Sequence, residues 1–502
     1  MRRLRNRGAP IAVFCAAWAF RFLTTGALEN DHFVSLARAH QVLHGAWPVR
    51  DFFDPGQPLA YLMSAGAAIV AGPSLLTEVA LAISILALAA SVTYVLARRA
   101  SGSGLIALAA VGLELAAYPR LYNAAKLLIP AVAVWLGWRY ADRPSTGRLA
   151  LLGAWTALAF LWRHDFAVYI GAPTLVLLFY EHAESLPLAR RRVLGYVAWC
   201  IACLIPWAAY VQWAAGLGFY AASALRFVAV ESQRTGRPDN IALVLIIIAI
   251  PLVAIGLARL QPGGTTNEGQ KPALTLSHVV FVATMAMTLD IVFLRDVITA
   301  RLPDVASLLV VLLAFIAGRA PRTFVRTTAV AAVIVAVIAV IVVPMRQQGY
   351  RAPTPGRIVR RAQMVASNLH DAKPVAVPDL ALLPLVHYLA SCTPAADRVL
   401  VSGFAPQIPV LARRAFAAGL PAWLGGYYTS ASDVDRAAAI LAREHVSLAV
   451  MLEGADAFTR SWPRLAADLR ARGFVERTWK IDDRAVVVWL PADRARDTPG
   501  CT

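Results

Sequence analysis

Residues 28–58, LENDHFVSLARAHQVLHGAWPVRDFFDPGQP, decide how this chain is interpreted. The stretch follows an N-terminal apolar segment and contains four acidic residues, three histidines and a Trp-Pro pair. It is too polar to cross a bilayer, and it lies where a membrane protein would have its first large outer loop. Acidic groups next to aromatic side chains at a membrane surface suggest chemistry on a lipid-borne substrate, and the rest of the chain tests that idea.

The composition is that of a membrane protein. Of the 502 residues, 59% are hydrophobic and only 16% are charged, whereas soluble domains are nearer half apolar. The mean hydropathy is +0.59. The net charge of +18 raises the question of nucleic acid, but the arginines lie between apolar runs and no basic patch is interleaved with aromatic residues. We therefore expect a mainly α-helical, polytopic membrane protein with no nucleic-acid partner.

Eleven apolar runs are candidate transmembrane helices, because a bilayer core needs about 20 apolar residues per helix. They lie at 9–27, 75–97, 103–118, 121–138, 148–162, 166–183, 193–215, 240–260, 273–294, 303–318 and 324–344. The first run resembles a signal peptide, but no A-x-A cleavage site precedes the acidic loop, so we expect it to remain as a span. The shorter apolar run 58–72 is predicted to be an amphipathic helix at the membrane interface.

The basic residues orient the chain. With the N-terminus inside, the inner segments hold seventeen arginines and lysines, and the outer segments before residue 344 hold nine. This bias follows the positive-inside rule, and treating 58–72 as a span would remove it. The predicted outer segments are 28–74, 118–122, 163–165, 216–239, 295–302 and everything after 344. We expect a bacterial-type inner membrane, a cytoplasmic N-terminus and an extracytoplasmic C-terminal part.

The chain changes character after the last apolar run. Short buried strands are predicted at 374–378, 398–403, 447–452 and 485–490, and helices at 355–369, 432–445 and 457–472. Asp433 and Thr459 lie near plausible helix starts. We therefore predict a membrane domain at 1–345 and an extracytoplasmic α/β domain at 346–502. Of the five cysteines, only Cys392 lies in the body of that second domain, so no disulfide framework is predicted.

The outer segments mix acidic and basic residues, whereas the inner segments are basic with few acids. A lipid-linked sugar donor carries an anionic phosphate at the level of the lipid head groups. Arginine and lysine can bind that phosphate and stabilise it as it leaves. A carboxylate can deprotonate the hydroxyl group of the acceptor. The chain has no Gly-rich phosphate-binding loop of the kind that binds nucleotides.

Residues 29–59 resemble the GT-C class of integral-membrane glycosyltransferases, related to protein O-mannosyltransferases and aminoarabinose lipid A transferases. The matching motifs are Glu29-Asn30-Asp31-His32, Leu43-His44-Gly45, Pro48-Val49-Arg50-Asp51-Phe52-Phe53-Asp54 and Gly56-Gln57-Pro58-Leu59. Members commonly have Asp-Glu where this chain has Asp31-His32, with Glu29 two residues earlier. The resemblance implies an inverting transferase that uses a polyprenyl-phosphate-linked sugar, with a glycan, lipid or protein of the cell envelope as acceptor.

The resemblance and the outer-loop chemistry together suggest roles for particular residues. The acid that activates the acceptor maps best to Asp31, with Glu29 as the alternative. The candidates for binding the donor phosphate are Arg295, Arg301, Lys126 and Arg120. The candidates for other substrate contacts are His32, Asp51, Asp54, Arg163, His164 and Asp165.

Several of these residues also have a structural interpretation. Asp51 and Asp54 could cap turns or bind Arg50, Arg120 could be an interfacial anchor, Lys126 could pair with Glu114, and Arg163-His164-Asp165 could be a hydrogen-bond cluster. The histidines and carboxylates could hold a divalent metal, but their spacing matches no tight ligand motif, so no cofactor is assigned.

Two other classes of function compete with a transferase. A transporter or flippase of lipid-linked sugars would show polar residues at mid-membrane and paired, interrupted half-helices. A non-catalytic membrane scaffold with an outer sensor domain would fit a degenerate acid motif, and Asp31-His32 is a slight departure from the family pattern.

Overall fold

The computed structural model describes residues 2–25, 27–28, 30–233, 241–260, 274–293, 298–319, 354–370, 382–481 and 483–499. The chain forms two compact units, each built from three separate stretches. The helical unit contains Met1–Thr25, Val79–Ile205 and Arg234–Val365. The sheet unit contains Gly26–Glu78, Pro206–Gln233 and Ala366–Thr502. The predicted domain boundary at 345/346 lies outside the described residues and stays a prediction.

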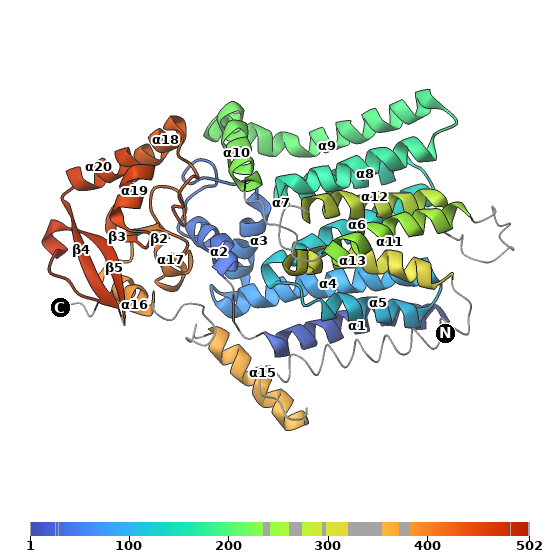
Figure 1. The fold of residues 1–502 in the computed structure, drawn as a ribbon, viewed down its shortest axis with the longest axis horizontal. Coiled ribbons are helices and arrows are strands. Elements are labelled where there is room, and N and C mark those ends of the chain that lie inside the picture. The colour runs from blue at the N-terminus through green and yellow to red at the C-terminus, as the bar shows by residue number, and fades with distance from the viewer. Residues whose placement is uncertain are drawn as a thin grey trace. The chain divides into compact units, whose positions relative to one another are not determined.

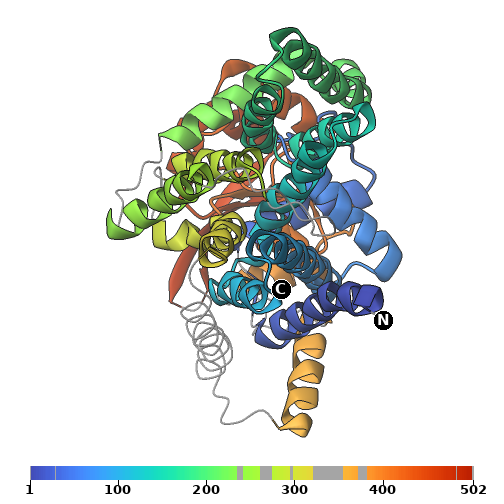
Figure 2. The ribbon, with the colours of Figure 1, turned by 90° about the vertical axis from the view of Figure 1, so that its right-hand side faces the viewer.

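The helical unit is a bundle of apolar helices that run side by side in Figure 1 and are seen from one end in Figure 2. The bundle helices are α1 (Arg2–Thr24), α4 (Leu75–Ser101), α5 (Gly104–Ala116), η1 (Leu121–Asn123), α6 (Ala124–Asp142), α7 (Thr146–Trp162), α8 (His164–Glu181), α9 (Leu186–Ala214), α11 (Ile241–Arg259), α12 (Leu276–Phe293) and α13 (Ile298–Ala317). The unit also contains the first part of α15 (Pro355–His370), a basic helix that is not part of the bundle. The chain stretches of α4, α9 and α15 continue into the sheet unit.

Each predicted span from 9–27 to 303–318 corresponds to one of these helices, and the predicted span 324–344 lies outside the described residues. Among the described residues, four helices are long and apolar enough to cross a membrane: Leu75–Ser101, Leu121–Asp142, Leu186–Ala214 and Ile241–Arg259. The count of eleven spans therefore stays a prediction, while the membrane character of the chain follows from these apolar helices.

Close packing in the bundle depends on a small residue on α6. A methyl group added at Gly137 would lie 2.1 Å from the ring of Phe281 on α12. Both Phe281 and the neighbouring Trp138 are fully buried. Since interiors are packed to near crystal density, the glycine is what lets α6 and α12 approach each other.

Among the described residues, the sheet unit contains a five-stranded sheet of order β2-β1-β3-β5-β4. The strands are β1 (Arg398–Ser402), β2 (Ala415–Phe416), β3 (Val446–Met451), β4 (Phe474–Ile481) and β5 (Arg484–Pro491). The helices are α2 (Asn30–Leu43), α3 (Pro58–Ala71), α10 (Leu217–Ser232), α16 (Leu383–Cys392), α17 (Gln407–Leu411), α18 (Ala431–Leu441), α19 (Ala455–Ser461), α20 (Pro463–Ala471) and η4 (Ala492–Arg494). β1 lies parallel to β2 and β3, whereas β5 is antiparallel to β3 and β4.

The predicted strands at 398–403, 447–452 and 485–490 are confirmed as β1, β3 and β5, and the strand predicted at 374–378 lies outside the described residues. Two strands were not predicted. β2 has only two residues, and β4 (FVERTWKI) carries four consecutive residues that are not fully buried, so neither shows a continuous apolar run. Both are edge strands of the sheet; β2 is buried but too short to show a pattern.

Asp433 lies near the start of a helix, as predicted, whereas the helix start predicted near Thr459 needs correction. The N-cap of α18 is Ser430, whose Oγ accepts the N–H of Asp433, so Asp433 lies within the first turn. Thr459 lies inside α19, which begins after Gly454. The single helix predicted at 457–472 is two helices, because Pro463 cannot continue α19 and instead begins α20.

Two predicted outer segments, 28–74 and 216–239, contribute described residues that assemble with the C-terminal sheet. The N–H of Phe53 donates to the carbonyl of Gly419 at 3.0 Å. Gln41 on α2 exchanges two hydrogen bonds of 3.2 Å with the backbone of Phe416 on β2. On α10, Arg226 binds the carboxylate of Asp433 on α18 at 2.9 Å. The first loop and α10 are therefore structural parts of the body that contains the C-terminal sheet.

The run 58–72 is a helix, α3, as predicted, and its location at the membrane interface stays a prediction. Tyr61 and Ala65 on its inner face are buried, and α3 packs against α2. Ile69 and Val70 near its end are 74% and 88% exposed.

Cys392 corrects one expectation from the sequence. It is disulfide-bonded, whereas the cysteine pattern predicted no disulfide framework. Spacing alone could not show this, because the geometry of a disulfide is set by how distant parts of the chain meet.

Candidate functional site

One end of the helical unit carries a group of charged side chains, which we call the cation cluster: Lys126, Arg163, Arg301, Asp165 and Asp304. The Nζ of Lys126 on α6 lies 2.7 Å from Oδ2 of Asp304 on α13. Arg301, one turn before Asp304, lies 3.8 Å from the same carboxylate. Asp304 is only 2% exposed, so it anchors both cations from within the bundle. The suggested pairing of Lys126 with Glu114 is therefore wrong.

The chain break between α7 and α8 supplies the other half of the cation cluster. Arg163 has an extended backbone and is both the C-cap residue of α7 and the N-cap residue of α8. Its guanidinium donates to both carboxylate oxygens of Asp165, through Nε at 2.6 Å and through Nη2. The hydroxyl of Tyr169 donates to Asp165 at 3.1 Å. These bonds hold Arg163 at the end of the bundle in a fixed direction.

The two halves act on each other electrostatically. Arg163 and Lys126 are close enough to repel each other. Lys126 attracts the carboxylate of Asp165, and Asp304 attracts the guanidinium of Arg163. Among the described residues, the cluster brings the cations Lys126, Arg163 and Arg301 together around the carboxylates of Asp165 and Asp304. Since charge near a membrane core is costly, such a cluster is a candidate site for an anionic ligand.

The other predicted residues of the helical unit lie in different settings. Arg120 is exposed and donates to the hydroxyl of Tyr122 at 2.7 Å. The imidazole of His164 stacks on Phe160 with ring centroids 4.1 Å apart. Arg295 lies outside the described residues. The structure thus groups Lys126, Arg163 and Arg301, although their roles in binding phosphate or substrate stay predictions.

A buried arginine within the first apolar run supports this end of the bundle. Arg21 on α1 is 2% exposed and donates to the carbonyl of Pro119 at 2.9 Å. Its guanidinium lies 3.9 Å from the centre of the Tyr118 ring. Arg21 therefore holds the turn between α5 and η1 against α1. A charged residue inside an apolar run was the only signal available in the sequence.

In the sheet unit, Asp31 lies in the first turn of α2 and is exposed to solvent. A carboxylate is favourable there because the N-terminal end of a helix carries a partial positive charge. The next residue, His32, is buried, and its Nε2 lies 2.8 Å from Oε1 of Glu78. His32 is thus held inside the protein, next to an exposed acid. Glu29 lies outside the described residues.

Asp51 has the structural contacts that were considered for it. It accepts hydrogen bonds from Nη2 of Arg50 at 2.7 Å and from the N–H of Trp47 at 2.8 Å. Burial alone would raise the pKa of Asp51, but the hydrogen bonds from Arg50 and Trp47 outweigh it and lower the pKa. The ionised carboxylate of Asp51 therefore stabilises the turn that contains it, and its role in substrate binding stays a prediction.

Asp54 is a buried turn-forming acid. Its Oδ1 accepts from the N–H groups of Gly56 at 3.1 Å and Gln57 at 3.0 Å, just before α3. Its Oδ2 accepts from the hydroxyl of Tyr220 on α10 at 2.6 Å. Burial, followed by the charge of Asp54, raises the pKa of Tyr220. Asp54 thus joins the first loop to α10, and contact with a substrate stays a prediction.

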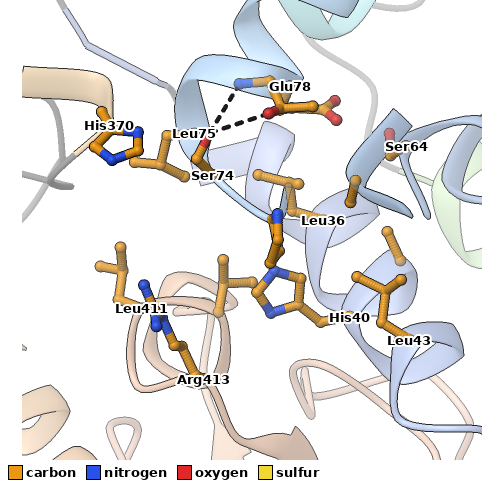
Figure 3. A pocket seen from close by; sticks show the side chains of 15 residues that line it. Leu36, His40, Leu43, Ser64, Ser74, Leu75, Glu78, His370, Leu411 and Arg413 are labelled. Carbon is orange, nitrogen blue, oxygen red and sulfur yellow. Dashed lines mark hydrogen bonds between the residues drawn. The ribbon is translucent and has the colours of Figure 1, made fainter. Parts of the chain in front are cut away.

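A small pocket of about 60 Å³ lies within the sheet unit and was not anticipated from the sequence (Figure 3). Its lining includes His40 and Leu36 on α2, Glu78 on α4, His370 and Arg413. Burial, followed by the charges of His44 and Arg413, lowers the pKa of His40 to about 4. Among the described residues there is no group of three or more His, Cys, Asp or Glu placed to hold a metal ion.

Comparisons with known proteins support the fold. No protein-family model matches the chain, and no characterised protein matches its sequence. Among solved structures, it is similar to the crystal structure of ArnT from Cupriavidus metallidurans bound to undecaprenyl phosphate, with a TM-score of 0.55 and 15% sequence identity. The match covers 96% of this chain and 97% of that one. The chain therefore has an ArnT-like fold of the GT-C type.

Proposed function

We propose that this protein is an inverting glycosyltransferase that moves a sugar from a polyprenyl-phosphate donor to an acceptor of the cell envelope. The observation that carries the proposal is the cation cluster within an ArnT-like fold. The similar ArnT structure contains undecaprenyl phosphate, and a cluster of two arginines and one lysine is suited to the phosphate of such a lipid. The sugar and the acceptor are left open by this argument.

The proposed reaction divides the work between two kinds of side chain. Asp31 takes the proton of the acceptor hydroxyl, and the acceptor oxygen bonds to the anomeric carbon of the sugar. The bond from that carbon to the phosphate oxygen breaks, and the phosphate leaves with the electron pair. Lys126, Arg163 and Arg301 stabilise the charge that develops on the leaving phosphate. A single displacement of this kind inverts the anomeric centre.

Two observations support an extracytoplasmic location for the acceptor side. The segments 28–74 and 216–233 and the C-terminal sheet were each predicted to lie outside, and they belong to one compact unit. Cys392 in that unit is disulfide-bonded, and disulfides persist in oxidising compartments. We propose that the sheet unit faces the outside of a bacterial-type inner membrane and shapes the acceptor site.

Binding of undecaprenyl phosphate to the purified full-length protein tests the phosphate site. We expect Lys126→Ala to weaken binding between about tenfold and about a hundredfold, because a hydrogen bond to a charged group contributes about 1.5–3 kcal/mol. Arg143→Ala is the matched control, since Arg143 is an exposed cation that caps the other end of the same helix. Equal affinity in the Lys126 and Arg143 variants would exclude the cluster as the phosphate site.

Transfer from a labelled polyprenyl-phosphate sugar tests the base. We expect Asp31→Asn to bind undecaprenyl phosphate normally and to lose transfer, whereas Glu29→Gln keeps it. Near-normal transfer by a folded Asp31→Asn variant would rule out Asp31 as the base, and loss only in Glu29→Gln would assign that role to Glu29. Movement of donor lipid across vesicles with no transfer product would instead support a flippase.

A further inference from the structure

Helix α15 (Pro355–His370, PGRIVRRAQMVASNLH) is strongly amphipathic and basic. It carries Arg357, Arg360 and Arg361 and has no acidic residue. Ile358, Val365 and Leu369 recur at helical spacing, so one face is apolar and the arginines lie beside it. A basic amphipathic helix of this kind is typical of segments that lie on a membrane surface.

The two halves of α15 differ in burial. In the second half, Val365 and Leu369 are only 4% and 1% exposed, so protein covers the apolar face there. In the first half, Ile358 is 37% exposed and Val359 is 55% exposed. The amphipathic face therefore continues beyond the part that the protein covers, and the first half presents apolar side chains next to arginines.

The position of α15 is set by a contact with α1. Nε of Arg361 donates to the carbonyl of Leu23 at 3.1 Å, and its Nη2 donates to the carbonyl of Thr25 at 3.3 Å. These carbonyls lie at the C-terminal end of an apolar helix, Gly8–Thr24. The last carbonyls of a helix have no partner within it and need one where the helix leaves the hydrocarbon. Arg361 therefore places the middle of α15 at the level where α1 ends.

We propose that the first half of α15, residues 355–364, is an interfacial helix that binds anionic phospholipid head groups. Arg357 and Arg360 contact the lipid phosphates, and Ile358 and Val359 insert below them. Three features favour an anionic lipid surface over a protein as the binding partner. The helix carries arginines and no acidic residue, and these arginines lie beside its apolar face. Arg361 also binds the end of an apolar helix. The inference does not depend on the proposed transfer activity.

Hydrogen exchange of the peptide covering 355–364 tests the proposal in the full-length protein. The protein is placed in nanodiscs of phosphatidylcholine alone, or of phosphatidylcholine mixed with phosphatidylglycerol. We expect slower exchange with phosphatidylglycerol, and we expect added salt to remove much of the difference. Equal protection in the two lipid mixtures at low salt would overturn the proposal, and this comparison needs no variant.

Charge variants separate the arginines of α15 from the overall charge of the protein. Each arginine near an anionic surface contributes about fivefold to the binding equilibrium, so Arg357→Gln with Arg360→Gln should lower the protection about thirtyfold. The control, Arg443→Gln with Arg496→Gln, removes the same charge from two exposed positions in the sheet unit. An equal loss of protection in both double variants would also overturn the proposal.

Discussion

Replacing Glu78 tests how the buried His32 pair affects the proposed base. The imidazole of His32 and the carboxylate of Glu78 are 2.8 Å apart, and their side chains are only 3% and 8% exposed. His32 directly follows Asp31 in the first turn of α2, while Glu78 lies in the first turn of α4. The pair therefore fixes the start of α2, from which the carboxylate of Asp31 extends.

The cost of breaking the pair follows from its burial. Removing one partner of a buried ion pair costs about 3–5 kcal/mol, and leaving a neutral buried donor without its partner costs about 1–3 kcal/mol. We therefore expect Glu78→Ala to lower the free energy of unfolding by about 3 kcal/mol. Glu78→Gln keeps an acceptor oxygen and should cost about 1 kcal/mol.

An exposed pair in the same unit is the control. The side chains of Asp435 and Arg464 are 60% and 57% exposed, and ion pairs in water contribute at most about 1 kcal/mol. Thermal unfolding of the detergent-solubilised protein compares Glu78→Ala with Asp435→Ala. Equal shifts in the unfolding midpoint would refute the argument from burial, and a double variant of His32 and Glu78 that showed simple additivity would refute their coupling.

Transfer kinetics separate positioning from stability. A shift of about 1 Å in a reacting group can cost about a hundredfold in rate, so we expect Glu78→Gln to lower kcat while the KM for the donor stays the same. Glu78→Asp should recover part of that loss. An unchanged kcat in folded Glu78→Gln would mean that the pair stabilises the fold without positioning Asp31.

Two further predictions concern the sheet unit. Burial lowers the pKa of His40 from 6.5 to about 4, so its contribution to stability is present above pH 6.5 and is lost as the pH falls through 4. Burial raises the pKa of Glu444 from 4.5 to about 7, so its contribution is present below pH 4.5 and is lost as the pH rises through 7. The two slopes, each about 1.4 kcal/mol per pH unit, oppose each other between pH 4.5 and 6.5. In Glu444→Gln only the effect of His40 remains, so the unfolding midpoint should fall as the pH decreases. In His40→Leu only the effect of Glu444 remains, so the unfolding midpoint should fall as the pH increases. Unfolding midpoints that do not change with pH in either variant would contradict these pKa shifts. For the second prediction, Asp433, 2% exposed and bound to Arg226, links α18 to α10. Asp433→Ala should cost about 2–3 kcal/mol and speed hydrogen exchange in α10; unchanged exchange there would show that α10 is held by its other contacts.

Local patterns in the sequence predicted much of the secondary structure. The apolar runs from 9–27 to 303–318 became helices, and the runs around Leu400, Ala449 and Val488 became β1, β3 and β5. These elements could be predicted because the spacing of apolar residues shows which face of a segment is buried, whatever that face packs against. The short edge strand β2 and the polar strand β4 lack that signal, so only the structure revealed them.

Tertiary structure alone decided which side chains meet. The sequence marked Lys126 and Arg301 as candidate cations, but the packing of α6 against α13 placed both on Asp304, which is 178 residues from Lys126. It assigned the first outer loop to the membrane domain 1–345, and only the structure showed that Phe53 of this loop donates to Gly419 inside the sheet unit. Pairing across such distances depends on how helices and strands pack, and that information is spread over the whole chain rather than held in any one motif.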